Sequence, residues 1–180
     1  MPSKSMIPSM LTGLLLCTVL NAQNEAKVIQ EFRNRVEQYS SVRNQQGVSS
    51  KQSSSANKLA QQKEEASEKG QQARPTARQG DIFTPEIAAY FKKQVQATLH
   101  GPGGEKVIAS LRRAEPLPSV HLEVNAPYPQ NLPLQSTPPT LLLNLPELPK
   151  GLQYRVVGST LVLYDEITSL VVDLIPGAVT

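Results

Sequence analysis

The stretch LQYRVVGSTLVLYDEITSLVVDLI, residues 152–175, decides the fold. Branched aliphatic and aromatic side chains, which favour strands, fill three short runs. A few turn-forming residues separate each run from the next, and connections this short join neighbouring antiparallel strands. The predicted strands and turns are, in order, 153–157, Gly158-Ser159, 160–164, Asp165–Thr168 and 169–175. The sequence therefore predicts a compact β-meander at the C-terminal end of the chain.

Two helices are predicted before this meander. Thr84 is a favourable N-cap, Pro85 suits the first helical position, and Glu86 complements the helix dipole. Apolar residues then recur at every fourth position, which predicts a helix over 85–99 with one buried face, formed by Ile87, Phe91, Val95 and Leu99. The glycine-rich segment after His100 ends this helix, and a shorter helix is predicted over 105–114.

Between the helices and the meander, apolar residues recur at every second position instead of every fourth. Val120, Leu122 and Val124 alternate with polar residues, which predicts a half-buried strand over 119–125. The run TLLLNL at 140–145 is typical of a more buried strand. The expected fold class is α+β, with two helices packed on a small, mainly antiparallel sheet. We place this domain at residues 81–180.

The N-terminus is typical of a secretory signal peptide. Lys4 precedes an uncharged apolar run of 11 residues ending at Leu20. That run is shorter than the roughly 20 residues that a membrane-spanning helix needs. Cleavage after Ala22 would remove residues 1–22, including Cys17, the single cysteine of the chain. Lipid attachment at Cys17 is the alternative, but a large leucine precedes it. The sequence therefore predicts a periplasmic or secreted protein whose mature chain lacks thiol chemistry.

Two segments with different chemistry follow the signal peptide. Residues 23–43 are predicted to form an amphipathic helix, because apolar side chains recur at helical spacing, namely Val28, Phe32, Val36, Tyr39 and Val42. Residues 44–80 are rich in Ser, Gln and Lys and are interpreted as a polar linker, which is either partly helical, over 56–69, or disordered. The interspersed glutamates and the lack of aromatic platforms argue against nucleic-acid binding.

Parts of the C-terminal half resemble a family of uncharacterised exported bacterial proteins. The blocks that carry the resemblance are QGDIFTPEIAAYF (79–91), NAPYPQNLPLQSTPPTLLLNLPELP (125–149) and residues 152–179. The resemblance implies export and a similar domain plan, and it implies no activity. Residues 154–175 are also distantly similar to the β-hairpin unit of RcnB-type periplasmic proteins, which are linked to nickel and cobalt homeostasis. The chain has two histidines and no mature cysteine, so we carry over the hairpin shape alone.

Candidate catalytic or metal-binding residues are few. His100 is expected at a helix end and His121 on the solvent side of its strand, and neither belongs to a metal-ligand motif. Asp165, Glu166 and Asp173 offer carboxylates, but we expect the first two in a turn and Asp173 pointing outward. No catalytic residue, cofactor site or metal site is therefore assigned.

These observations lead to a functional hypothesis with alternatives. We expect a non-enzymatic interaction module whose amphipathic helix docks on the domain, self-associates or binds a protein partner through Val28, Phe32, Val36 and Tyr39. An edge strand that accepts a partner strand is a second route. The competing hypotheses are a small-ligand or metal-responsive periplasmic binding protein, and an enzyme. An enzyme would need several side chains to converge between helix 85–99 and the sheet, drawn from Tyr90, His100, His121, Tyr128 and Tyr154.

Overall fold

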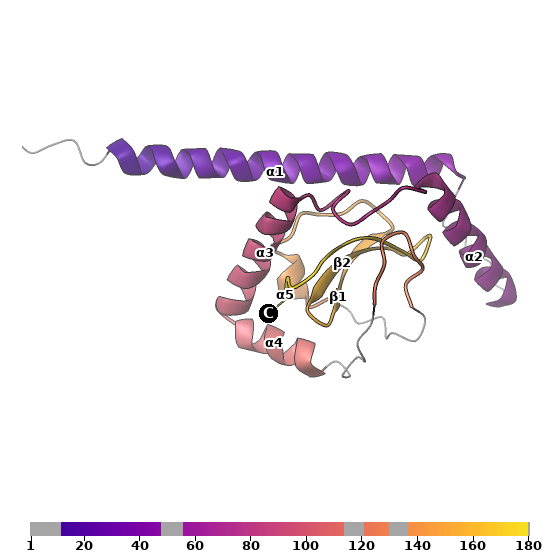
Figure 1. The fold of residues 1–180 in the computed structure, drawn as a ribbon. Coiled ribbons are helices and arrows are strands. Elements are labelled where there is room, and N and C mark those ends of the chain that lie inside the picture. The colour runs from indigo at the N-terminus through magenta and orange to yellow at the C-terminus, as the bar shows by residue number, and fades with distance from the viewer. Residues whose placement is uncertain (1–11, 48–55, 114–120, 130–136, 180) are drawn as a thin grey trace, which may run out of the picture.

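The computed structural model describes residues 12–47, 56–113, 121–129 and 137–179 (Figure 1). Five helices and three strands lie in these ranges. In chain order they are α1 (Thr12–Gln45), α2 (Ala56–Ala73), α3 (Pro85–His100), α4 (Gly104–Arg113), α5 (Pro139–Leu142), β1 (Leu152–Val157), β2 (Thr160–Asp165) and β3 (Leu170–Ile175).

The predicted meander is confirmed. The three strands form one antiparallel sheet in the order β1-β2-β3. Val157 pairs with Thr160 across a two-residue turn, in which Gly158 has a φ of 58° that suits glycine. The register shifts at a β-bulge beside Leu163 and Tyr164. The α+β fold class is therefore correct, because helices pack on this small antiparallel sheet.

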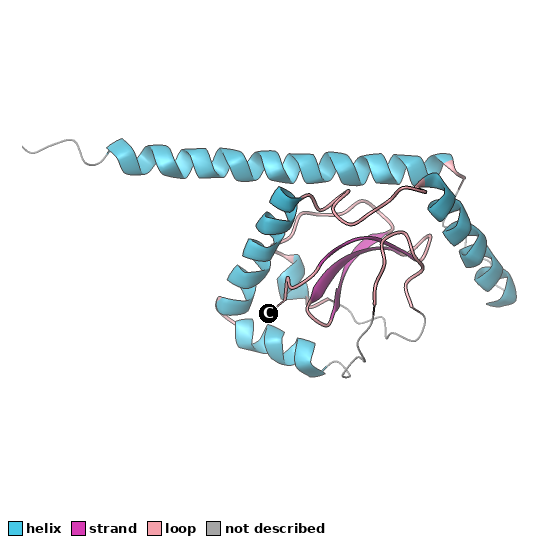
Figure 2. Cartoon of the chain, in the orientation of Figure 1, coloured by secondary structure: helices cyan, strands magenta, loops and turns pink. Residues whose placement is uncertain are grey.

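Helix α1 runs across the top of the domain in the view of Figure 2. Helix α3 begins near α1 and runs along one side of the sheet, and α2 lies beyond the C-terminal end of α1. The N-terminal part of α1 extends past the rest of the domain (Figure 1). This helix includes residues 12–22 of the predicted signal peptide and the whole predicted amphipathic helix, 23–43, while residues 1–11 lie outside the described ranges. Helix α2 covers the stretch in which a polar helix was expected, and its Gly70 lies against Leu170 of β3.

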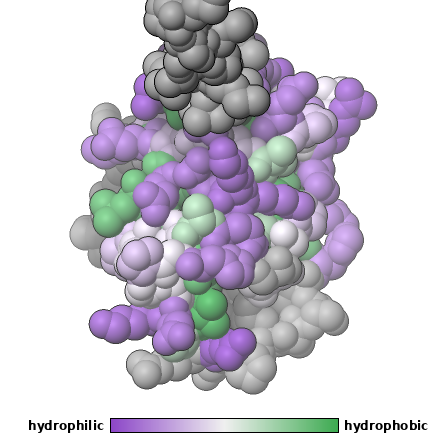
Figure 3. All heavy atoms as spheres, turned by 90° about the vertical axis from the view of Figure 1, so that its left-hand side faces the viewer, coloured by the Kyte–Doolittle hydropathy of each residue, from purple (hydrophilic) through white to green (hydrophobic). Residues whose placement is uncertain are grey.

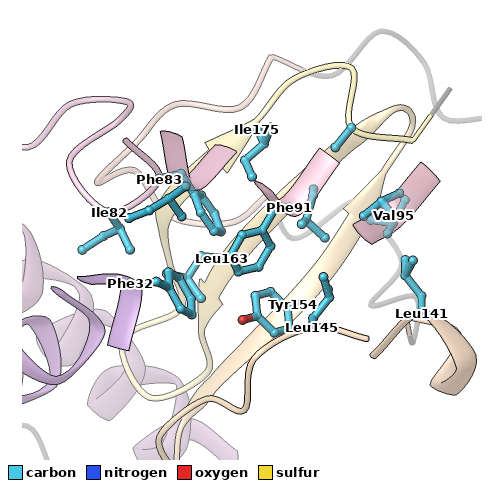
Figure 4. Close-up of a cluster of buried hydrophobic side chains, with 14 of the residues drawn as sticks. Phe32, Ile82, Phe83, Phe91, Val95, Leu141, Leu145, Tyr154, Leu163 and Ile175 are labelled. Atoms are coloured by element: carbon cyan, nitrogen blue, oxygen red, sulfur yellow. The ribbon is translucent and has the colours of Figure 1, made fainter. Parts of the chain in front are cut away.

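Two hydrophobic clusters cover the two faces of the sheet. The larger lies between the sheet and helices α1 and α3, where Phe32 and Phe91 meet with ring centroids 4.8 Å apart (Figure 4). Tyr154 of β1 joins this cluster, 5.8 Å from Phe91. The smaller cluster lies on the opposite face, around Tyr128, Val157, Val162, Tyr164, Val171 and Leu174. The first cluster fixes α1 and α3 to the sheet.

The prediction for α3 is confirmed. The Thr84 hydroxyl accepts a hydrogen bond from the backbone N–H of Ile87 at 3.4 Å, and Pro85 is the first helical residue. The residues spaced by four, Ile87, Phe91, Val95 and Leu99, are all buried. Helix α4 also forms as expected, with Val107 facing inward.

The strand predicted over 119–125 is wrong for the residues that the structure describes, 121–125, which form a loop and a turn. Residues 119 and 120 lie outside the described ranges. Asn125 has a φ of 64°, which an extended strand cannot accommodate. Its side-chain amide donates to the carbonyl oxygens of Gln71 and Arg74, so contacts with a distant segment hold the turn. Leu122 and Val124 still pack on the smaller cluster.

The strand predicted over 140–145 is also wrong. Residues Pro139–Leu142 form the short helix α5, and a turn follows. Pro139 lacks an N–H and has the φ of a first helical residue, which favours a helical turn over a sheet strand. Leu141 and Leu145, four residues apart, are buried, whereas Leu143 between them is 83% exposed. The buried residues of this apolar run are therefore spaced as in a helix and not as in a strand.

Candidate functional site

The two histidines considered for an active site do not join the tyrosines, although Tyr90 and Tyr154 both adjoin the large hydrophobic cluster. His100 is exposed at the end of α3, and its Nδ1 lies 2.9 Å from the carbonyl oxygen of Gln96. His121 is exposed in a loop, beside Glu123. Tyr154 lies in the large cluster and Tyr128 on the opposite face of the sheet. The space between α3 and the sheet is filled by apolar side chains.

Asp165 at the end of β2 is fully buried and joins three parts of the chain. Its Oδ2 accepts a hydrogen bond from the Tyr39 hydroxyl at 2.7 Å and lies 3.3 Å from Nη1 of Arg43. Its Oδ1 accepts from the backbone N–H groups of Ile167 and Thr168, which closes the β2–β3 turn. Burial, and then the Asp165 charge, raise the pKa of Tyr39. Asp165 therefore fastens α1 to the sheet.

Asp173 does not point outward, as the sequence analysis expected. It is fully buried and pairs with Leu163 on the helix-covered face of the sheet. Its Oδ2 accepts from the backbone N–H groups of Ile82 and Phe83, both at 2.8 Å, and its Oδ1 accepts from that of Gly80 at 3.0 Å. Backbone donors satisfy this carboxylate. Its role is to hold the segment that leads into α3.

The apolar face of α1 packs against the large hydrophobic cluster between the helices and the sheet. Phe32, Val36 and Tyr39 are buried, and Val28 packs partly against the same cluster. Arg35 adds a hydrogen bond to the carbonyl oxygen of Asp81 at 2.7 Å. Of the fates considered for this helix, docking on its own domain is the arrangement found here.

A groove with a volume of about 590 Å³ lies between β1 and the segment that contains α5. Its apolar lining includes Leu142, Leu145, Leu148 and Leu152. Its polar lining is formed by Thr137, Glu147, Gln153 and Arg155. The groove presents an apolar floor with a few polar groups, the usual make-up of a binding site.

Hydrogen bonds fix both walls of this groove. The Thr137 hydroxyl donates to the carbonyl oxygen of Tyr154 at 2.7 Å, and the Tyr154 hydroxyl donates to that of Pro146 at 2.9 Å. The N–H of Leu152 donates to the carbonyl oxygen of Pro149 at 3.1 Å. Because these bonds join β1 to the opposite wall, the groove is preformed rather than opened by a ligand.

Exposed leucines stand beside the groove. Among the described residues, the large hydrophobic side chains that remain exposed are Leu142, at 39%, and Leu143, at 83%. The molecular face that includes α3 and α4 is mainly hydrophilic, with small scattered hydrophobic areas (Figure 3). The combination of a groove and adjoining leucines forms the candidate binding surface, which we call the β1 groove.

Sequence reasoning missed the β1 groove because its walls come from segments 137–148 and 152–155, which meet only in the folded chain. The sequence did offer one signal, the three consecutive leucines Leu141–Leu143. In a helical turn, three consecutive side chains cannot all face the core, so one of them has to be exposed. Reading this run as a buried strand hid the exposed leucine.

Two further features bear on the alternatives considered. Across the described ranges, no group of three or more His, Cys, Asp or Glu side chains is placed to hold a metal ion. None of the helices in that part of the chain combines the length and apolar character needed to cross a membrane.

Comparisons with family models, curated proteins and solved structures find no match to this chain.

Proposed function

We propose that this protein is an exported, non-enzymatic interaction module that binds another protein through the β1 groove. The observation that carries the proposal is the preformed apolar groove with the 83% exposed Leu143 beside it. Soluble proteins bury most large apolar side chains, and an exposed apolar patch next to a hollow is typical of a docking surface. The partner would supply an apolar side chain to the floor between Leu145 and Leu148.

Partner binding or self-association through Val28, Phe32, Val36 and Tyr39 is the other route that the sequence suggests. These side chains already pack against the chain's own domain. A partner that used them would have to displace α1 and break the contacts of Tyr39 and Arg43 with Asp165. The β1 groove requires no such rearrangement, so we place the main binding surface there.

Export is the second part of the proposal, and the N-terminal sequence supports it. The proposed cleavage point after Ala22 lies inside α1, so processing would precede folding of this helix. The α1 side chains that pack in the core follow the cleavage point, and the mature helix would keep them. Mass spectrometry of the protein from the periplasm or the medium tests this: we expect Gln23 at the N-terminus, and an uncleaved cytoplasmic chain would refute export.

Affinity purification tests the binding surface. The tagged full chain is expressed in its native host beside Leu148→Arg, which places a charge in the groove, and Ala89→Arg, which adds the same charge on an exposed part of α3. We expect a partner that is retained by wild type and Ala89→Arg and lost with Leu148→Arg. Equal recovery by all three would place the interaction elsewhere, and the lack of any partner would contradict the proposal.

A small apolar ligand is the second candidate occupant. The groove volume of about 590 Å³ falls in the usual range for small-molecule sites, roughly 300–1,000 Å³. Native mass spectrometry of the protein purified from its host distinguishes the two: a bound mass of a few hundred daltons, lost in Leu148→Arg, would favour the ligand over a protein partner.

A further inference from the structure

We infer that the occupant of the β1 groove is a second copy of this chain, and that two copies join by reciprocal insertion of Leu143. This inference rests on the proposed function, because it names the partner of the same surface. A second copy is sufficient to bury the exposed leucine, and it supplies the apolar side chain that the groove lacks.

The first support is that the projecting residue directly follows a residue that lines the groove. Leu142 lines the groove, and Leu143, the next residue, projects into solvent. A surface that carries both a projection and a hollow can pair with its own copy under twofold symmetry, so that each copy gives and receives the same side chain. A closed dimer results, with no surface left to extend it into a filament.

The second support is the charge next to the groove. Glu147 lines it, Lys150 lies three residues further along, and both are exposed. A twofold axis can bring each acid opposite the base of the other copy. Opposite charges of this kind favour one orientation of the two copies and raise the rate of encounter. They also predict that the dimer weakens as salt concentration rises.

The third support concerns how the two copies would touch. In the described residues, β1 pairs with β2 alone, so its other edge invites strand addition. However, the carbonyl oxygen of Tyr154 already accepts the Thr137 hydroxyl, and the N–H of Leu152 is bonded to Pro149. These bonds occupy groups that a partner strand would need. The contact is therefore insertion of a side chain rather than extension of the sheet.

Sedimentation velocity of the purified full chain over a range of concentrations tests the inference. We expect a reversible dimer for wild type, a dissociation constant at least ten-fold higher for Leu143→Glu, and a change within two-fold for the matched control Ala89→Glu. Circular dichroism confirms that each variant folds. A wild-type monomer at several hundred micromolar would overturn the inference, as would a Leu143→Glu chain that dimerises like wild type.

Cysteine cross-linking checks the same contact in a Cys17→Ser background. A tagged Leu143→Cys chain is mixed with an untagged Leu148→Cys chain, and we expect a disulfide-linked pair of one tagged and one untagged chain. As a control, an untagged Lys106→Cys chain, with its cysteine on α4, is used in place of the Leu148→Cys chain, and we expect no such pair. If the chain is monomeric but Leu148→Arg still loses a different captured protein, the dimer is wrong and the proposed function stands. If neither a dimer nor a captured partner is found, both fail.

Discussion

The Tyr39 hydroxyl of α1 donates a 2.7 Å hydrogen bond to the Asp165 carboxylate at the end of β2, 126 positions later in the chain. Both side chains are buried, and Arg43 lies beside the same carboxylate oxygen. One short contact thus joins the N-terminal helix to the C-terminal meander. A hydrogen bond to a buried charged group is stronger than one between neutral groups.

Replacing Tyr39→Phe removes this hydrogen bond and keeps the ring. We expect the free energy of unfolding to fall by about 1.5–3 kcal/mol, because a buried carboxylate loses one of its donors. Urea unfolding at pH 7 measures it. Tyr164→Phe is the control, since the contacts described for Tyr164 are ring contacts with Tyr128 and Arg155. Equal losses in the two variants would mean that the bond to Asp165 adds nothing.

Alkaline pH should destabilise the fold through two buried phenols. Burial raises the pKa of both Tyr39 and Tyr154 above the usual value near 10. The stabilisation that each phenol gives is therefore complete below pH 10 and declines above it, as the unfolded chain ionises first. Each contributes a slope of about 1.4 kcal/mol per pH unit there. Urea titrations between pH 8 and 11 should show a shallower decline for Tyr39→Phe than for wild type; parallel curves would contradict this.

Replacing Asp173→Asn should be among the most damaging single-atom changes. The carboxylate accepts from the backbone N–H groups of Gly80, Ile82 and Phe83, and an amide has one acceptor oxygen in place of two. We expect a loss of about 3 kcal/mol or more, from unsatisfied buried donors. The exposed Glu166→Gln, which makes the same chemical change, should lose under about 0.5 kcal/mol. Similar thermal unfolding of the two would show that Asp173 does not anchor this segment.

Alanine substitutions at two glycines distinguish the effect of backbone strain on stability from the effect of crowding. Gly151 and Gly158 have φ values of 90° and 58°, so both disfavour alanine. A Cβ at Gly151 would also lie 2.5 Å from Ile167 Cδ1 and 3.1 Å from Nη1 of Arg43, whereas nothing lies within 4 Å at Gly158. We expect Gly151→Ala to lose about 2–3 kcal/mol and Gly158→Ala about 1 kcal/mol. The reverse order in urea unfolding would contradict the packing described here.

The meander and α3 were predictable because their signals are local. The run of β-formers with Gly158-Ser159 fixed the first hairpin, and the four-residue spacing from Ile87 to Leu99 fixed the helix. Asp173 was misplaced because a charged residue in an apolar strand normally faces solvent. Its donors come from residues 80–83, about ninety positions earlier, and no local pattern reports such a partner.

The β1 groove was missed for the same reason. The segment at 121–125 and the run at 140–145 have strand-like patterns, but Asn125 bonds to the end of α2 and Pro139 begins a helical turn. Tertiary contacts overrode the local preference in the first case, and proline chemistry did so in the second. The exposure of Leu143 follows from that turn.

Site-specific photo-crosslinking in living cells tests the central claim, binding at the β1 groove, most directly. A photoreactive amino acid replaces Leu143 in one strain and the exposed Ala89 in another. We predict a discrete protein adduct from position 143, twice the chain's mass if the partner is a second copy, and none from position 89. The absence of an adduct at position 143, or identical adducts at both positions, would contradict the account.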